Sequence, residues 1–180
     1  GLVLRSNVAG KTKTTRVRET IAPMTVRKIA FALQDVASGP GPQAVQLGLY
    51  QDDALLDEID FNIEVKDSSQ AYRRTFVSEI DGSLQYYGVR QGQAEPGKRP
   101  AMFLSGHGAG VKGLGQAAAY QPKDWGHVIA PTNRREFGFD WEDWGRIDAI
   151  EALAHAESLY GTDPVRTYLT GHSMGGHGAW

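Results

Sequence analysis

The chain has 180 residues and a formal net charge of −2, with 19 Lys and Arg residues against 21 Asp and Glu residues. This balance provides no basic field for nucleic acid or an anionic membrane surface, and no apolar run approaches the roughly 20 residues that span a bilayer. Hydrophobic residues make up 41% and cysteine is missing, so we expect a folded globular protein without disulfides or thiolate chemistry. We expect neither nucleic acid nor a membrane as a partner, while compartment and oligomeric state stay open.

The first third of the chain alternates apolar and polar residues, the pattern of a strand with one buried face. The alternation is clearest in DEIDFNIEVK (57–66) and recurs in AVQLGLY (44–50) and KIAFALQ (28–34), with turn clusters ASGPGPQ (37–43) and QDDA (51–54) between them. No amphipathic pattern of helix length lies between these predicted strands. We therefore predict a small antiparallel β-sandwich-like accessory domain over residues 1–70, whose completeness at the N-terminus is left open.

Charged clusters in this region have two interpretations. The basic run KTKTTRVR carries Lys11, Lys13, Arg16 and Arg18 and suits either a polyanion site or a solvated strand face. Because runs of charge are usually solvated faces, we favour the second. The acidic QDD and LLDEID clusters are assigned to turn and surface chemistry in the same way.

The hydrophobic pattern changes in residues 71–180, where predicted strands alternate with predicted helices. A hairpin is predicted over 73–89 with Asp81 and Gly82 at its turn, followed by strands at 100–105, 126–131 and 165–170. Helices are predicted over 114–121 and 141–161; in the second, Ile147, Ile150, Leu153 and Ala154 share a face and Gly161 forms the C-terminal cap. This order predicts an α/β fold with a parallel sheet and right-handed crossovers, preceded by an antiparallel hairpin.

The segment Gly171-His172-Ser173-Met174-Gly175 fits the G-x-S-x-G pattern of a nucleophile elbow. It follows an apolar strand and precedes small residues that can start a helix. Such a turn exposes the serine hydroxyl above the sheet edge, and side chains at Gly171 or Gly175 would collide with backbone. The backbone N–H of Met174 then lies where negative charge develops. A purely structural Gly/Ser turn is the alternative.

The loop after the first parallel strand, SGHGAG (105–110), is expected to supply the second oxyanion-hole donor. Gly108 and Gly110 let the backbone turn its amides inward, so we assign this donor to the N–H of Ala109. His107 either touches substrate or, as we favour, hydrogen-bonds the loop into shape.

The loop after the next strand, PTNRREFGFDWEDWG (131–145), lies at the edge where open α/β sheets bind ligands. Its aromatic residues suit an apolar subsite and an arginine suits a substrate carboxylate, or else the rings pack under the helix. The candidate substrate-binding residues are His107, Gly108, Asn133, Arg134 and His172. His172 and His177 lack partners at metal-ligand spacing, so no metal and no cofactor are predicted.

The stretch DPVRTYLTGHSMGGHGAW (163–180) resembles the α/β-hydrolase group of predicted peptidases and esterases that are related to prolyl oligopeptidases and polyhydroxybutyrate-depolymerase-like esterases. The resemblance covers about residues 72–180. It implies that Ser173 is the acyl-forming nucleophile, with Met174 and Ala109 as oxyanion donors. The group usually has L-H-G-x-G directly after the strand, whereas here Ser105 and Gly106 precede His107.

In this fold the triad order is Ser, then Asp or Glu, then His, and only seven residues follow Ser173. We therefore expect the front part of a larger serine hydrolase, acting on a small-molecule ester or a peptide, whose acid and His belong to a missing C-terminal part. The chain by itself is expected to be inactive or nearly so and poorly stable. The alternative is a non-catalytic β-sandwich binding module attached to a degenerate hydrolase domain.

Overall fold

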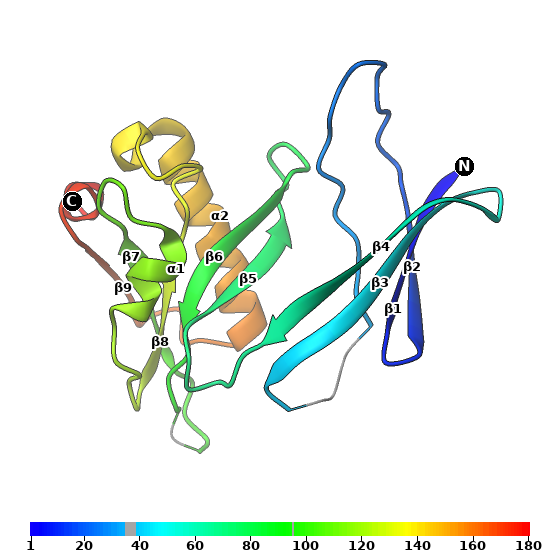
Figure 1. Cartoon of the computed structure of the whole chain (residues 1–180). Coiled ribbons are helices and arrows are strands. Elements are labelled where there is room, and N and C mark those ends of the chain that lie inside the picture. The colour runs from blue at the N-terminus through cyan, green and yellow to red at the C-terminus, as the bar shows by residue number, and fades with distance from the viewer. Residues whose placement is uncertain (35–38, 95) are drawn as a thin grey trace. The chain divides into compact units, whose positions relative to one another are not determined.

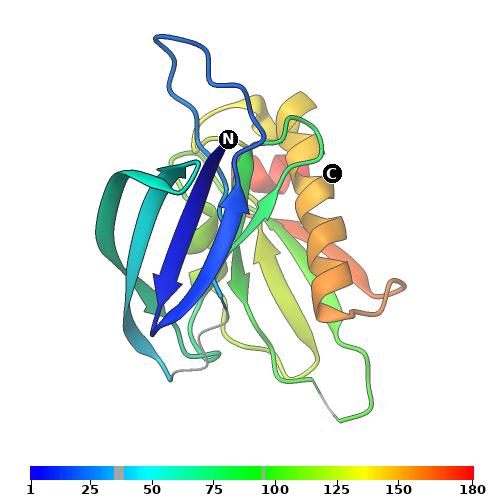
Figure 2. The ribbon, with the colours of Figure 1, turned by 90° about the vertical axis from the view of Figure 1, so that its right-hand side faces the viewer.

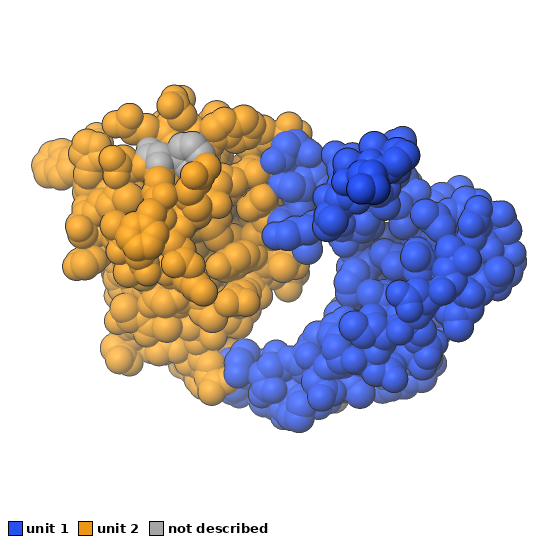
Figure 3. Space-filling model, turned by 45° about the horizontal axis from the view of Figure 1, so that its top comes forward, with its two compact units in different colours: residues 1–67, 81–84 blue, residues 68–80, 85–180 orange. Residues whose placement is uncertain are grey.

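The structure, a computed structural model, describes residues 1–34, 39–94 and 96–180. It divides into two compact units: unit 1 comprises Gly1–Asp67 and Asp81–Leu84, and unit 2 comprises Ser68–Ile80 and Gln85–Trp180 (Figure 3). The roles predicted for residues 1–70 and 71–180 remain predictions. Among the described residues, every helix is too short or too polar to cross a membrane.

Unit 1 contains a four-stranded sheet with the order β2-β1-β3-β4 (Figure 1). Its strands are β1 (Leu2–Val8), β2 (Lys11–Arg16), β3 (Gly41–Gln51) and β4 (Ala54–Val65), and each pair is antiparallel. The predicted strands at 44–50 and 57–66 are confirmed as parts of β3 and β4. Strand β1 was not predicted; it pairs with β2 across a tight turn at Ala9 and Gly10, both with positive φ.

The strand predicted at 28–34 is wrong, because this segment joins no ladder with the described strands. Side chains take the place of a partner strand. Ser6 Oγ donates to Ala32 O at 2.8 Å, and Ala32 N donates to Thr15 Oγ1 at 2.9 Å. Phe31 still packs edge-on against Phe61, so the apolar alternation has a packing role. Two residues of the predicted turn at 37–43, Ala37 and Ser38, lie outside the described residues.

The β-sandwich prediction is not confirmed, since the described residues of unit 1 form one sheet. Alternation along β4 holds at Phe61 and Ile63, which are partly buried between exposed polar neighbours. Leu55 and Ile59, however, are 52% and 58% exposed. The pattern therefore predicted the strand and its faces but not a second layer. The solvated face predicted for the basic run is found at Lys11 and Lys13, which are exposed on β2.

Unit 2 contains a five-stranded sheet with the order β5-β6-β8-β7-β9. The strands are β5 (Tyr72–Val77), β6 (Leu84–Arg90), β7 (Ala101–Gly106), β8 (Gly126–Ala130) and β9 (Thr167–Gly171). Strands β8 and β9 run parallel to β7, and β6 is antiparallel to β8. The predicted hairpin is present as β5 and β6, with Gly82 at φ +69° in the turn. Unit 2 is thus α/β with a mixed sheet, as the alternation of strands and helices predicts.

The helices of unit 2 are α1 (Gly113–Ala118), α2 (Asp143–Tyr160) and α3 (Met174–Gly178), with a 3₁₀ turn η1 (Phe139–Trp141). Along the sheet the chain steps from β7 to β8 and then back past β7 to β9. Two right-handed crossovers in opposite directions place α1 and α2 on opposite faces. Figure 2 shows α2 lying along its face of the sheet. The predicted cap is confirmed, because Gly161 adopts the left-handed conformation after α2.

The apolar face predicted for α2, with Ile147, Ile150, Leu153 and Ala154, is only partly buried, since Leu153 packs against the core. Ala149, Ala152 and Ala156 are buried, whereas Ile147 and Ile150 are 38% and 55% exposed. Small side chains let the helix approach the sheet closely, and the core beneath it is completed by larger residues on the strands. This core contains Phe76, Tyr87, Val89, Met102, Ile129, Ala152 and Ala156. Large apolar side chains on the helix were therefore a poor guide to its packed face.

Candidate active site

Ser173 lies in the turn between the end of β9 and the start of α3, as the sequence predicts. Its backbone has φ 53° and ψ −117°, a conformation that side chains other than glycine rarely adopt. Gly176 N and His177 N donate to Ser173 O at 2.8 and 3.1 Å, which holds the turn closed. The serine itself is exposed. A strained, well-anchored turn thus presents a hydroxyl at the carboxyl edge of the parallel strands.

Glycines make this turn possible through backbone contacts. A Cβ on Gly171 would lie 2.1 Å from Gly175 O, and a Cβ on Gly175 would lie 2.0 Å from Gly106 O. The collision predicted for Gly171 and Gly175 is therefore present in the structure. Gly106, at the end of β7, was not predicted to take part. The ends of two parallel strands and the start of α3 are packed backbone against backbone.

The loop that follows β7 lies against the serine turn. A Cβ on Gly108 would be 3.4 Å from Ser173 Cβ and 3.0 Å from His172 Nδ1. His172 N also donates to Gly106 O at 3.2 Å, which ties the serine turn to the end of β7. Two predicted substrate-binding residues, Gly108 and the exposed His172, are therefore next to Ser173.

Hydrogen bonds fix the orientation of the Ala109 amide. Val111 N donates to Gly108 O at 3.1 Å, and His107 Nδ1 lies 2.9 Å from the same oxygen. In a trans peptide the N–H points away from the carbonyl of the same unit, so the Ala109 N–H points away from these partners. The next peptide is held by the bond from Gly110 N to Glu136 O at 3.0 Å.

Two backbone donors near Ser173 remain free. Within the part of the chain that the structure describes, the N–H groups of Ala109 and Met174 have no acceptor. Ala109 is exposed and Met174 is partly exposed. Unpaired amides beside an exposed hydroxyl are the arrangement that stabilises an oxyanion.

His107 is placed as a loop-forming residue rather than a substrate contact. Its side chain is 1% exposed, and Nε2 lies 2.9 Å from Thr132 O. Both ring nitrogens therefore face backbone carbonyls, those of Gly108 and Thr132. The interpretation that the ring shapes the loop is the one that this geometry supports.

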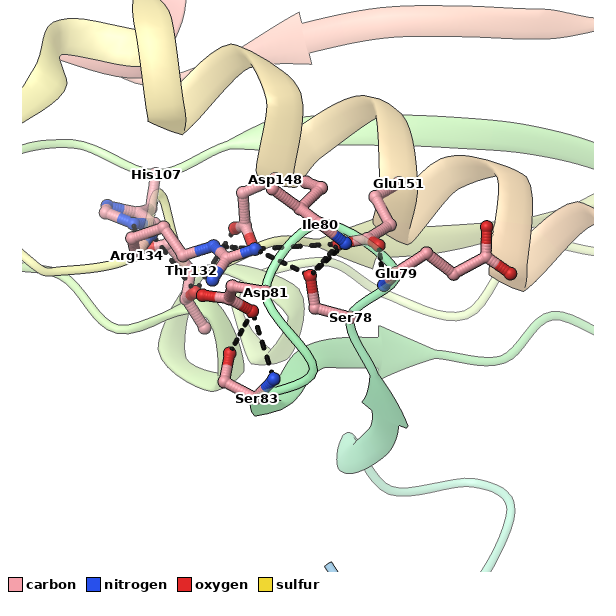
Figure 4. Close-up of polar contacts among 10 residues, drawn as sticks. All are labelled: Ser78, Glu79, Ile80, Asp81, Ser83, His107, Thr132, Arg134, Asp148 and Glu151. Atoms are coloured by element: carbon pink, nitrogen blue, oxygen red, sulfur yellow. Dashed lines mark hydrogen bonds and ion pairs between the residues drawn. The ribbon is translucent and has the colours of Figure 1, made fainter. Parts of the chain in front are cut away.

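Arg134 is not available to bind a substrate carboxylate, contrary to the interpretation from sequence. Its side chain is 11% exposed, with Nε 3.1 Å from Asp148 Oδ1 and Nη2 3.6 Å from Glu151 Oε2. Nη2 also donates to Ser78 Oγ at 3.0 Å. Figure 4 shows the guanidinium among these side chains. The charge of Arg134 is already neutralised by two carboxylates of α2.

Asp148 completes this buried cluster and connects it to Thr132, whose hydroxyl donates to Asp148 Oδ2 at 3.2 Å. Burial raises the pKa of the Asp148 carboxyl, while the Arg134 guanidinium and the Thr132 hydroxyl act in the opposite direction. Thr132 O is also the partner of His107, so the cluster braces the loop after β8 against the loop after β7 (Figure 4). Sequence patterns gave no signal for these contacts.

Asn133 likewise shapes its own loop. It is fully buried with a positive φ of 55°, and Nδ2 donates to Gly138 O. Its Oδ1 atom is buried without a hydrogen-bond partner among the described residues. A side chain without exposed surface cannot touch a substrate in this conformation.

The aromatic residues of the 131–145 loop divide between the two interpretations. Trp141 is 6% exposed and packs inside unit 2. Phe137 is 68% exposed, and its Cζ would lie 2.9 Å from a Cβ on Gly110, so its ring forms a wall beside the loop after β7. Trp144 is 45% exposed. Of the rings described, Phe137 is therefore the one placed to contact a bound group near Ala109.

Catalytic partners for Ser173 are not found among the described residues, where the Ser173 hydroxyl has no hydrogen bond to a histidine or a carboxylate. His177 Nε2 lies 3.6 Å from Glu142 Oε1, but both side chains are at least two-thirds exposed. A group of three or more potential metal ligands is also missing from the described residues.

An apolar pocket of about 420 Å³ in unit 2 is lined by residues of β7, β9, α2 and α3, including Gly106 and Gly175. Its lining includes Leu104, Ile150, Leu153, Leu169 and Trp180, and Ser173 is not part of it. The pocket therefore adjoins the serine turn without including Ser173.

No protein-family model and no curated protein matches this sequence. Among solved structures, a thermostable esterase is 15% identical with a TM-score of 0.46, over 99% of this chain and 63% of that chain. The substrate-bound fluorophosphonate-binding serine hydrolase FphF of Staphylococcus aureus is 13% identical (TM-score 0.46, 58% of this chain and 48% of that chain). A CE1 ferulic acid esterase from Anaeromyces mucronatus in complex with ferulic acid is 16% identical (TM-score 0.44, 59% and 49%). The chain spans less than two thirds of each, and TM-scores below 0.5 assign it neither a family nor an activity.

Proposed function

We propose that the protein is a serine hydrolase in which Ser173 attacks an ester or amide carbonyl and forms an acyl-enzyme. The observation that carries this proposal is the exposed Ser173 hydroxyl, in a turn with positive φ, beside two backbone N–H groups without acceptors. A structural Gly/Ser turn would have no reason to leave these amides unpaired, because a backbone donor without a partner costs free energy.

The chemistry follows from these groups. Ser173 Oγ adds to the carbonyl carbon and the carbonyl oxygen becomes negative. The N–H groups of Ala109 and Met174 donate to that oxygen, and losing one such donor typically lowers kcat by about 10²–10³-fold. Collapse of the tetrahedral intermediate expels the alcohol or amine, and water then hydrolyses the acyl-enzyme.

Proton transfer needs a general base that takes the Ser173 proton and returns it to the leaving group. We propose that a His and an acid in a part of the parent protein outside this sequence supply it, as the family resemblance implies. No cofactor takes part in this mechanism. The 180-residue chain alone is then inactive or nearly so, and unit 1 serves as an accessory β domain.

The substrate class is a small-molecule ester or a peptide with an apolar group near the scissile carbonyl. Phe137 supports the apolar group, since its exposed ring stands next to Gly110 in the same loop as Ala109. Arg134 gives no support to a carboxylate-bearing substrate, because its charge is paired.

The test is hydrolysis of nitrophenyl esters and peptide anilides by the whole protein, before and after Ser173→Ala. We expect kcat to fall at least about 10⁴-fold, since removal of a nucleophilic serine leaves only binding and oxyanion effects. Ser158→Ala, an exposed serine of α2, is the matched control and should retain full activity. Undiminished hydrolysis by Ser173→Ala would refute the proposal.

A second measurement is the intact mass of the protein as its source makes it. A mass well above the 19.6 kDa of this chain leaves room for the acid and the His. A mass of 19.6 kDa would contradict the mechanism and favour the non-catalytic binding module.

A further inference from the structure

We infer that Trp141 is a positioning residue. Its side chain fixes the position of the loop carrying Ala109 relative to the turn carrying Ser173 and Met174. The inference rests on the proposed function. Trp141 belongs to neither of these segments: it lies in η1, immediately before α2. It is 6% exposed, so its side chain acts through protein contacts rather than by touching substrate.

The first set of contacts is with the loop after β7. Trp141 Nε1 donates to His107 O at 3.1 Å, and its ring packs edge-on against the His107 imidazole with centroids 4.9 Å apart. His107 O belongs to the peptide unit directly before the one that carries the Ala109 N–H. Between them stands Gly108, whose backbone is intrinsically free to rotate. An external anchor at His107 O therefore limits where the Ala109 N–H can point.

The second set of contacts is with the strand end and the serine helix. A Cβ on Gly178 of α3 would lie 2.2 Å from Trp141 Cβ, and a Cβ on Gly106 would lie 3.2 Å from Trp141 Cε2. Both positions have room for the tryptophan because they carry no side chain. One residue therefore touches the end of β7, the loop after it and the helix that begins at Met174.

The backbone around Trp141 is held in an unfavourable conformation. Asp140, Trp141 and Asp143 have φ of 41°, 65° and 41°, in the left-handed region that non-glycine residues rarely occupy. Such conformations persist where surrounding contacts impose them. Here the contacts of the Trp141 indole with the loop after β7 and with α3 are the ones that stabilise this backbone conformation. The relative placement of the two oxyanion donors thus depends on a side chain more than 30 residues from either of them in sequence.

The indole N–H is the specific element, and Trp141→Phe removes it while keeping an aromatic ring. Small displacements of catalytic groups lower rate rather than binding, so we expect kcat to fall about 10-fold or more with KM within about two-fold of wild type. A boronic acid, which mimics the tetrahedral intermediate, should lose affinity by the same factor as kcat. Trp144→Phe, at the start of α2 and 45% exposed, is the control and should change neither value.

The experiment uses the whole protein and counts active sites with a fluorophosphonate before kcat is measured. A positioning role predicts a lower kcat per titrated site and weaker boronate binding. A purely structural role predicts fewer titrated sites with unchanged kcat per site, and that result would overturn the inference. If Trp141→Phe does not fold, benzothienylalanine at position 141 keeps the indole shape without its N–H and gives the same two readouts. Ser173→Ala separately tests the proposed function, because it abolishes hydrolysis whether or not Trp141 positions the loop.

Discussion

The parallel strands of unit 2 define two edges of the sheet: the carboxyl edge, which carries Ser173, and the amino edge opposite it. The backbone polar groups at these two edges are paired in different ways. At the edge opposite Ser173, Gly92 N donates to His127 Nδ1 at 2.9 Å and Asp163 N donates to Pro100 O at 2.8 Å. The Arg99 side chain binds the carbonyls that end α2. At the edge with Ser173, the amides of Ala109 and Met174 have no acceptor within the described chain.

The comparison shows that the features which destabilise the folded state are concentrated at the Ser173 edge. Unpaired backbone donors and a positive φ at Ser173 each raise the free energy of the folded state. Both occur at one edge, next to one exposed hydroxyl. We therefore expect changes at this edge to affect activity strongly, and changes at the opposite edge to affect stability alone.

The largest effect is expected from Gly175→Ala. Its Cβ would lie 2.0 Å from Gly106 O, so the strand end and α3 must separate. We expect the free energy of unfolding to fall by about 3 kcal/mol, the upper end of the usual cost of overpacking, and hydrolysis to fall with it. Urea unfolding and ester hydrolysis measure the two losses.

Gly176→Ala is the matched control for that change. Its Cβ would meet only Gly171 O at 3.7 Å, an ordinary contact. Replacing glycine in a helix should then be neutral or stabilise by up to about 1 kcal/mol. Equal effects of the two alanines would contradict the close backbone packing of this edge.

The opposite edge should respond to pH through His127, which is 5% exposed. Burial lowers the pKa of His127, and its Nδ1 must be unprotonated to accept from Gly92 N. A histidine with a folded pKa below its unfolded value of about 6.5 contributes stability above that pH, and this is lost as pH falls through the folded pKa.

We expect the free energy of unfolding to decline below about pH 6.5, with about 1 kcal/mol from the broken hydrogen bond alone. His127→Gln, which keeps an acceptor but does not titrate, should weaken this dependence, and the part that remains comes from His155, whose pKa burial also lowers. Urea unfolding between pH 8 and pH 5 provides the comparison. If the variant and the wild type show the same slope, the pH dependence has another source.

A substitution at Ser173 is expected to raise the free energy of unfolding rather than to lower it. Ser173→Gly removes the Cβ from a backbone with φ 53°, and we expect a gain in stability of about 1 kcal/mol together with loss of hydrolysis. Ser173→Ala keeps the Cβ and should not gain stability. Thermal unfolding distinguishes them, and identical midpoints would mean that the turn stores no strain.

The smallest effect is expected from Arg99→Met. Arg99 is an exposed residue that donates to Gly161 O at 3.2 Å and to Thr162 O. We expect a loss of about 0.5–1 kcal/mol with unchanged kcat. Arg99→Lys should fall between this variant and the wild type in urea unfolding. A change in kcat would show that the two edges are not independent.

Sequence patterns predicted the local features of unit 2 well. The strands at 100–105 and 126–131 are continuous apolar runs bounded by turn residues, and both lie within a residue of β7 and β8. The turn at Ser173 depends on neighbouring glycines in the sequence, so it was also predictable. The α2 face was not, because alanine gives a weak hydrophobic signal even where a helix packs tightly.

Features that depend on distant contacts could not be predicted. The strand expected at 28–34 is missing because Ser6 and Thr15 take the hydrogen bonds of Ala32. The sequence suggested that Arg134 is available for a substrate carboxylate. The two carboxylates of α2 that pair with it become its neighbours only in the folded chain. Trp141 gave no signal for its bond to His107 because 34 positions separate them.

Gly106, Gly171 and Gly175 together limit how this site can be redesigned. Each would place a Cβ within about 3 Å of backbone atoms, so a combinatorial library that varies them would consist mostly of misfolded members. Phe137 and His172 carry exposed side chains beside the same loop and tolerate diversity. Directed evolution of substrate preference should therefore randomise these two positions on an invariant three-glycine frame.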